Sequence, residues 1–141
     1  MVKLIGRIKP KKVTIALILL WTSFISFVLE VIIVSLFVPP SHFKLAISKT
    51  TETIIQLTGW IFMIVFFIFL IFLILMISKG KNWARITYLI LFILSIPYNI
   101  LQSLSVLLEV PYLIIVSVLY FATSIIGLGL LFTKQSNNWF N

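Results

Sequence analysis

Glu30 is the residue whose position supports the most specific chemistry, because it is an acidic side chain inside a long apolar stretch, residues 13–38. A carboxylate within a bilayer costs about 2.5–3.5 kcal/mol or more, so it should face protein or water and have a partner, or carry a proton. Ala16, Ser23 and Ser26 precede it at helical spacings that put all four residues on one face. We therefore expect this face to be the inner one.

Polar and small residues recur at helical spacings in the other apolar stretches as well. They are Gln56 and Gly59 in the second stretch, Tyr88, Ser95, Asn99 and Gln102 in the third, and Ser117, Tyr120, Ser124 and Gly127 in the fourth. In an antiparallel arrangement of the helices, most of these polar residues lie at a similar depth in the membrane. We predict an intramembrane polar cluster of Glu30, Asn99, Gln102, Ser117, Tyr120 and Gln56, with helix packing at Ser124 and Gly127.

Three interpretations of this cluster stay open. Polar side chains between membrane helices commonly act as packing and hydrogen-bonding groups, at about 0.6 kcal/mol each. The cluster is also of the kind that titrates protons or binds a ligand. In the third interpretation, Glu30 simply extends to the membrane surface, which its off-centre position allows.

Catalytic constellations are missing from the sequence. There is no cysteine and no aspartate, and His42 is the only histidine. This composition excludes thiol chemistry, Ser-His-Asp triads and the usual zinc sites. No glycine-rich nucleotide loop or HExxH motif occurs. We therefore predict that the chain is not an enzyme and holds no metal or cofactor.

The composition is that of an integral membrane protein. Of 141 residues, 62% are hydrophobic and only 10% are charged, too few charges to cover a water-soluble fold of this size. Four apolar stretches approach or exceed the roughly 20 residues that span a bilayer. We predict an all-α membrane protein, a single domain over 1–141 forming an antiparallel four-helix transmembrane bundle, with helices at about 13–38, 53–77, 86–106 and 112–133 and a polar tail.

The distribution of Lys and Arg predicts the orientation. Nine of the 11 basic residues flank one side of the predicted bundle, in the N-terminal segment, the 78–85 loop and the tail, and two lie in the 41–52 loop. By the positive-inside rule both termini are cytoplasmic. Because the basic residues flank apolar stretches instead of covering a folded surface, the net charge of +8 does not indicate nucleic-acid binding.

Two motifs carry a resemblance. The loop Gly80-Lys81-Asn82-Trp83-Ala84-Arg85 and the ending LLFTKQSNNWF, residues 130–140, resemble small bacterial inner-membrane proteins that share a GxNWAR loop, a proline-containing third helix and a LLF…SNxWF tail. The resemblance covers about the C-terminal half and implies a four-helix protein of the bacterial inner membrane without an assigned activity. We expect the loop and tail to pack together, with Lys81, Trp83, Arg85, Trp139 and Phe140 at the lipid interface.

Our leading functional hypothesis is helix-mediated interaction with itself or with another membrane protein, in an accessory or immunity-type role. The alternative is a small oligomeric transporter or channel that uses intramembrane Glu30. A lipid-binding protein that holds anionic lipid at residues 79–85 is a third class. The lipid bilayer is the one partner that every hypothesis shares, and no hypothesis involves nucleic acid.

Overall fold

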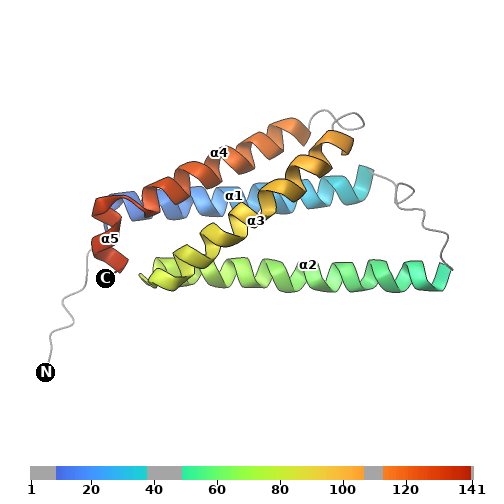
Figure 1. Cartoon of the computed structure of the whole chain (residues 1–141), viewed down its shortest axis with the longest axis horizontal. Coiled ribbons are helices and arrows are strands. Elements are labelled where there is room, and N and C mark those ends of the chain that lie inside the picture. The colour runs from blue at the N-terminus through green and yellow to red at the C-terminus, as the bar shows by residue number, and fades with distance from the viewer. Residues whose placement is uncertain (1–8, 38–48, 107–112, 141) are drawn as a thin grey trace, which may run out of the picture.

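The computed structural model describes residues 9–37, 49–106 and 113–140, with the side chains of 49, 52 and 98–106 left out. This described part of the chain is entirely helical (Figure 1). Its helices are α1 (Lys11–Phe37), α2 (Lys49–Ser78), α3 (Asn82–Val106), α4 (Leu113–Leu131) and the short α5 (Lys134–Phe140). The first four correspond to the four predicted apolar helices, whereas α5 lies in the tail for which no helix was predicted.

Local sequence explains where the helices begin and end. The Pro10 carbonyl accepts hydrogen bonds from the backbone N–H groups of Val13 and Thr14, at 3.0 and 3.2 Å, and so opens α1. At the end of α2, Gly80 takes φ +75°, which a residue with a Cβ rarely adopts. The Gly80 N–H then bonds the Ile77 carbonyl at 2.9 Å, and the Lys81 N–H bonds the Met76 carbonyl at 3.1 Å. This is the Schellman pattern that ends a helix, and it turns the chain directly into α3.

Helices α1 and α4 form the closest pair and run side by side in opposite directions (Figure 1). Small residues line their contact: Ala16 and Ser23 on α1 and Ser124 on α4 are fully buried. The hydroxyl groups of Ser23 and Ser124 are hydrogen-bonded to each other. Small side chains allow membrane helices to approach closely, so the small-residue faces predicted from the sequence form this interface.

Among the described residues, helix α2 packs its buried side chains against the other helices along its C-terminal part. Leu73, Ile74 and Ile77 are fully buried there, together with Val13 and Leu20 of α1. Toward its N-terminus α2 extends away from α1, while α3 crosses from the end of α2 toward the start of α4 (Figure 1). The hydrophobic core is therefore concentrated in the half of the molecule that contains the α2–α3 turn.

Three helical segments are long and apolar enough to cross a membrane: Lys11–Phe37, Thr53–Ser78 and Leu113–Leu131. In α3 the apolar part that the structure describes, Asn82–Pro97, is shorter. Large hydrophobic side chains cover the outside of these helices, including Ile18 of α1 at 60% exposed and Phe62 of α2 at 70% exposed. An apolar outer surface of this kind is suited to lipid contact.

Candidate functional site

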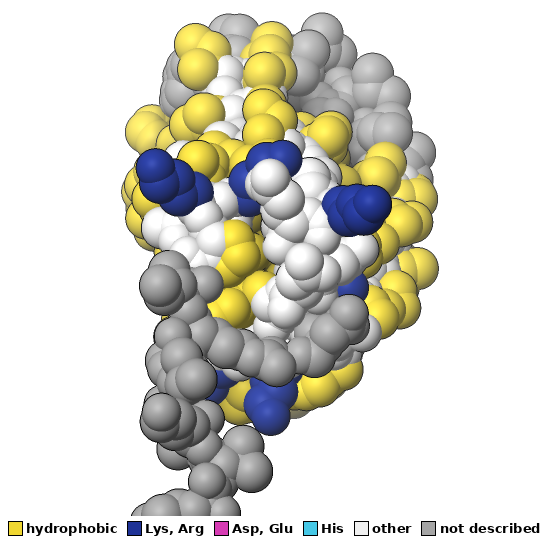
Figure 2. Space-filling view, turned by 90° about the vertical axis from the view of Figure 1, so that its left-hand side faces the viewer, with side chains coloured by type: hydrophobic (Ala, Val, Ile, Leu, Met, Phe, Trp, Pro, Cys, Tyr) yellow, Lys and Arg dark blue, Asp and Glu magenta, His cyan; other side chains and the backbone are white. Residues whose placement is uncertain are grey.

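Lysine and arginine side chains gather at one end of the molecule, around a polar centre (Figure 2). We call this the basic end; its described basic residues are Lys9, Lys11, Lys12, Lys79, Lys81, Arg85 and Lys134. The Nζ of Lys9 donates a hydrogen bond to the Ser78 hydroxyl at 3.1 Å and so connects the start of α1 to the end of α2. The basic end thus joins the starts of α1, α3 and α5 to the end of α2.

Arg85 is the centre of the contacts at the basic end. Its side chain is only 8% exposed, and its Nη1 donates to the Leu131 carbonyl at 3.0 Å and to Asn137 Oδ1 at 2.7 Å. Its Nε donates to Asn82 Oδ1 at 2.6 Å. The backbone carbonyl at the end of α4 has no partner within its own helix, so Arg85 satisfies it. Arg85 on α3 thus caps the C-terminal end of α4.

Two aromatic rings hold the Arg85 guanidinium in place. Its central carbon lies 4.5 Å from the centre of the Phe140 ring and 4.9 Å from that of Phe132. Both distances are within cation–π range. Phe140 is only 6% exposed, so its predicted position at the lipid interface is wrong: this ring belongs to the core. Trp83, at 47% exposed, remains on the outside and packs against Phe72, with ring centres 6.0 Å apart.

The GxNWAR loop and the tail pack together, as predicted from the sequence. A methyl group added at Gly80 would lie 3.0 Å from the Trp139 carbonyl oxygen and 3.1 Å from the Trp139 indole nitrogen. That indole nitrogen is buried and has no hydrogen-bond partner among the described residues. Trp139 therefore packs over the α2–α3 turn.

Part of the predicted polar cluster forms around Glu30. The Ser117 hydroxyl donates to Glu30 Oε1 at 2.7 Å, which links α1 to α4. The other carboxylate oxygen, Oε2, is buried and accepts no hydrogen bond from the residues that are described. The side chains of Asn99 and Gln102, predicted to complete the cluster, lie outside the described set. Of the predicted cluster, the structure thus places Ser117 in hydrogen-bond contact with Glu30, and Tyr120 close enough to interact with it electrostatically.

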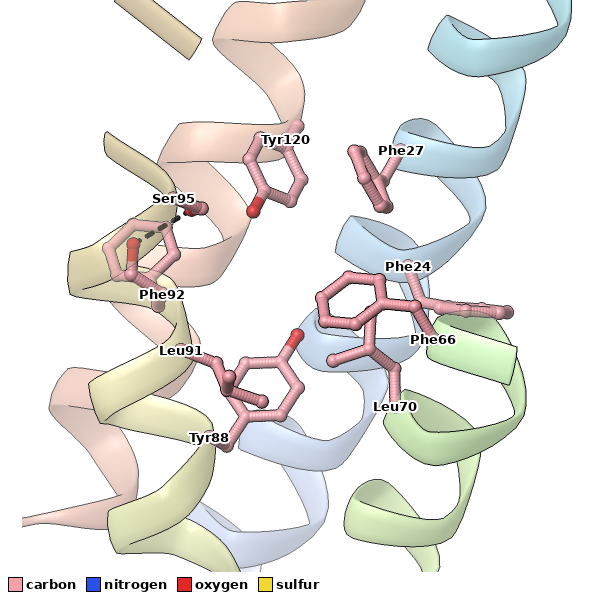
Figure 3. Close-up of a pocket in the computed structure, with 9 residues that line it drawn as sticks. All are labelled: Phe24, Phe27, Phe66, Leu70, Tyr88, Leu91, Phe92, Ser95 and Tyr120. Carbon is pink, nitrogen blue, oxygen red and sulfur yellow. Dashed lines mark hydrogen bonds between the residues drawn. The ribbon is translucent and has the colours of Figure 1, made fainter. Parts of the chain in front are cut away.

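Tyr120 contributes to a separate feature, a small pocket of about 40 Å³ between the helices. The pocket is lined by Phe24, Phe27, Phe66, Leu70, Tyr88, Leu91, Phe92, Ser95 and Tyr120, and the hydroxyl groups of both tyrosines point toward its interior (Figure 3). The Ser95 hydroxyl donates a hydrogen bond to the Phe92 carbonyl at 2.8 Å in the wall of this pocket (Figure 3). Ligand pockets usually enclose about 300–1,000 Å³, so this space is too small for a ligand of ordinary size.

Gln56 does not join the polar cluster. Its side chain is exposed. The N-terminal part of α2 extends away from the other helices (Figure 1). We call residues 53–62 the exposed α2 segment, because every residue in it is exposed. A Cβ added at Gly59 would meet nothing within 4 Å. This separation was not predicted, and no local sequence pattern in α2 indicates it.

Comparisons with known proteins return no match: no family model, no curated protein and no solved structure is significantly similar to this chain. The residues described above are therefore the basis for a functional hypothesis. Among them, the exposed α2 segment combines Gln56 and Gly59 on a surface that is exposed at every residue.

Proposed function

We propose that this chain is a multi-pass, non-enzymatic protein of the bacterial inner membrane that acts through helix contacts within the bilayer. In this proposal α1 to α4 form an antiparallel four-helix arrangement, and the basic end faces the cytoplasm together with both termini. The exposed α2 segment is the recognition surface. Its exposure on every side is the observation that carries the proposal.

Polar groups elsewhere are already engaged inside the protein. Ser124 is hydrogen-bonded to Ser23, and a Cβ added at Gly127 would lie 3.3 Å from side-chain atoms of Leu19 and Leu20. These positions hold α1 to α4, so they are not available for a partner. The exposed α2 segment differs because it combines the Gln56 amide with Gly59, one turn further on, and both are exposed. Small and amide residues are the types that mediate association of membrane helices.

The partner that these residues fit best is a second copy of the chain. In a two-fold symmetric contact the same residue meets itself across the axis. An amide side chain is suited to such a contact because its NH₂ group donates and its carbonyl accepts. Gly59 would let the two backbones approach each other, as small residues do in membrane helix pairs. The alternative partner of the exposed α2 segment is a helix of another membrane protein, which corresponds to the accessory or immunity-type role.

The test compares two glycines that both face open space. We expect Gly59→Leu to convert the full-length protein from dimer to monomer, because the added side chain would hold two α2 helices apart. Gly129→Leu, on an exposed face of α4, is the matched control and should leave the dimer intact. The measurement is energy transfer between labelled copies in lipid nanodiscs, with thermal stability recorded for both variants.

The results distinguish a second copy of the chain from another membrane protein as the partner of α2. A monomeric wild-type protein that co-purifies with another membrane protein, and loses it in Gly59→Leu, would replace the second copy by a heterologous partner. A wild-type protein without any partner, or equal effects of the two leucine variants, would contradict the proposal that α2 is the recognition helix.

A further inference from the structure

The α2–α3 turn combines exposed positive charge with an exposed apolar stripe on α3. Lys79 and Lys81 are both exposed at the turn. Directly after them, Trp83, Ile86 and Ile90 are 47%, 43% and 51% exposed. Their spacings of three and four place these three side chains on one face of α3, directly after the turn that carries the lysines. The basic group and the apolar stripe are therefore continuous.

Among the described residues, no acidic side chain pairs with the charge at this turn. The sequence holds three acidic residues, Glu30, Glu52 and Glu109, and none of them lies in or beside the segment 79–90. Glu30 is held by Ser117 on the far side of the core, and Glu52 lies near the opposite end of α2. Arg85 does not contribute, because its guanidinium is directed toward Asn82, Leu131 and Asn137. The two lysines are the groups that present free positive charge next to the stripe.

We infer that the 79–90 surface binds an anionic phospholipid, with Lys79 and Lys81 contacting the phosphate headgroup and Trp83, Ile86 and Ile90 contacting one acyl chain. Charge complementarity selects the headgroup, since each Lys near an anionic membrane surface contributes about fivefold to affinity. The stripe selects a lipid over free phosphate, because phosphate has no apolar part to contact it. Trp83, packed on Phe72, lies at the junction, where an indole ring is suited to the boundary between apolar and polar regions.

The inference is tested with full-length protein in mild detergent, which removes any effect of membrane orientation. Phosphatidylglycerol and phosphatidylcholine with the same acyl chains are titrated, and bound lipid is counted by native mass spectrometry. We expect the wild-type protein to prefer phosphatidylglycerol and the Lys79→Gln/Lys81→Gln variant to bind it about 25-fold more weakly. The matched control, Lys44→Gln/Lys49→Gln, removes the same charge from the sequence before and at the start of α2 and should bind as the wild type does.

A third variant tests the apolar part of the surface. Ile86→Ser/Ile90→Ser keeps every charge and should weaken phosphatidylglycerol binding, while its helical content and thermal stability show that it remains folded. Three results would overturn the inference. They are equal binding of the two lipids, equal loss in the two lysine variants, and full competition by millimolar inorganic phosphate, which would reduce the surface to a simple anion contact.

Discussion

Gly80 packs directly against Trp139, so the end of α2 and the C-terminal tail meet where only a glycine fits. The left-handed φ of +75° at Gly80 and the 3.0 Å approach of an added Cβ to the Trp139 carbonyl oxygen both disfavour a side chain. Because Gly80 also ends α2, the same residue lies at the turn into α3 and against α5. The tail is thus part of the fold.

Gly80→Ala should destabilise the protein by about 1–2 kcal/mol from the backbone conformation alone, with a further loss from contact with Trp139. The change is measured as thermal unfolding followed by tryptophan fluorescence. Gly129→Ala is the matched control; it lies in a helix with open space around it and should stabilise by about 0.5–1 kcal/mol. Equal effects of the two substitutions would contradict the proposed role of the Gly80 conformation.

Replacing Arg85 should release the tail. Arg85→Lys retains the charge but loses the planar guanidinium that donates three hydrogen bonds and lies close to two rings. Hydrogen bonds to charged groups contribute about 1.5–3 kcal/mol each, so we expect a loss of at least about 2 kcal/mol. Limited proteolysis should then cleave after Lys134 faster than in the wild type. Asn137→Ala removes only one of these contacts and should have a smaller effect, and unchanged cleavage in Arg85→Lys would show that the guanidinium does not hold α5.

Gly127→Leu should disrupt the folding of the protomer itself. Its Cβ would already lie 3.3 Å from Leu19 and Leu20 and 3.4 Å from the Ala16 carbonyl oxygen, so a leucine forces α1 and α4 apart. Overpacking of this kind costs about 1–3 kcal/mol. Thermal stability should fall in monomers and dimers alike. A variant of normal stability that only fails to associate would place Gly127 at an interface between copies.

Ser124→Ala at the same interface should have only a small effect, because a hydrogen bond between membrane helices contributes about 0.6 kcal/mol on average. Combined with Ser23→Ala in a double-mutant cycle, it should give a coupling energy of that order between the two hydroxyl groups. Unfolding in a detergent series provides the measurement. A coupling near zero would mean that small size, and not hydrogen bonding, is what this pair contributes.

If the protein acts through helix contacts, Glu30→Gln should change its stability only slightly and should not affect ion flux. Glutamine keeps an oxygen that can accept the hydrogen bond from Ser117, so stability should change by less than about 1 kcal/mol. Stability and ion flux in proteoliposomes are measured together, with Ser117→Ala as the control for the lost hydrogen bond. A pH-dependent flux in the wild type that Glu30→Gln abolishes, without loss of stability, would favour the transporter hypothesis instead.

The absence of cysteine allows a direct test of orientation with single introduced cysteines. Lys81→Cys and Lys134→Cys at the basic end should react with a membrane-impermeant maleimide only after cells are permeabilised. Thr50→Cys, at the other end of α2, should react in intact cells. The reversed pattern would exclude cytoplasmic termini, and labelling of all three in intact cells would exclude a membrane-spanning arrangement.

The sequence by itself determined the helical fold, because long apolar stretches in a chain this poor in charge can satisfy their backbone groups in lipid only as helices. It also identified the buried small-residue faces, since Ala16, Ser23, Ser124 and Gly127 follow helical spacing among larger residues. The contact between the 80–85 loop and the tail followed from matching interface residues on one side of the membrane. In each case the deciding signal is local and periodic.

Only the tertiary structure decided which apolar faces pack against other helices and which stay exposed. Gln56 was expected inside and lies outside, whereas Phe140 was expected at the interface and lies in the core. The physical reason is that lipid is as apolar as a phenylalanine-rich helix face, so hydrophobicity does not record which surface a membrane helix contacts. The separation of the N-terminal part of α2 from the other helices depends on how all the helices pack. The sequence of α2 alone does not indicate it.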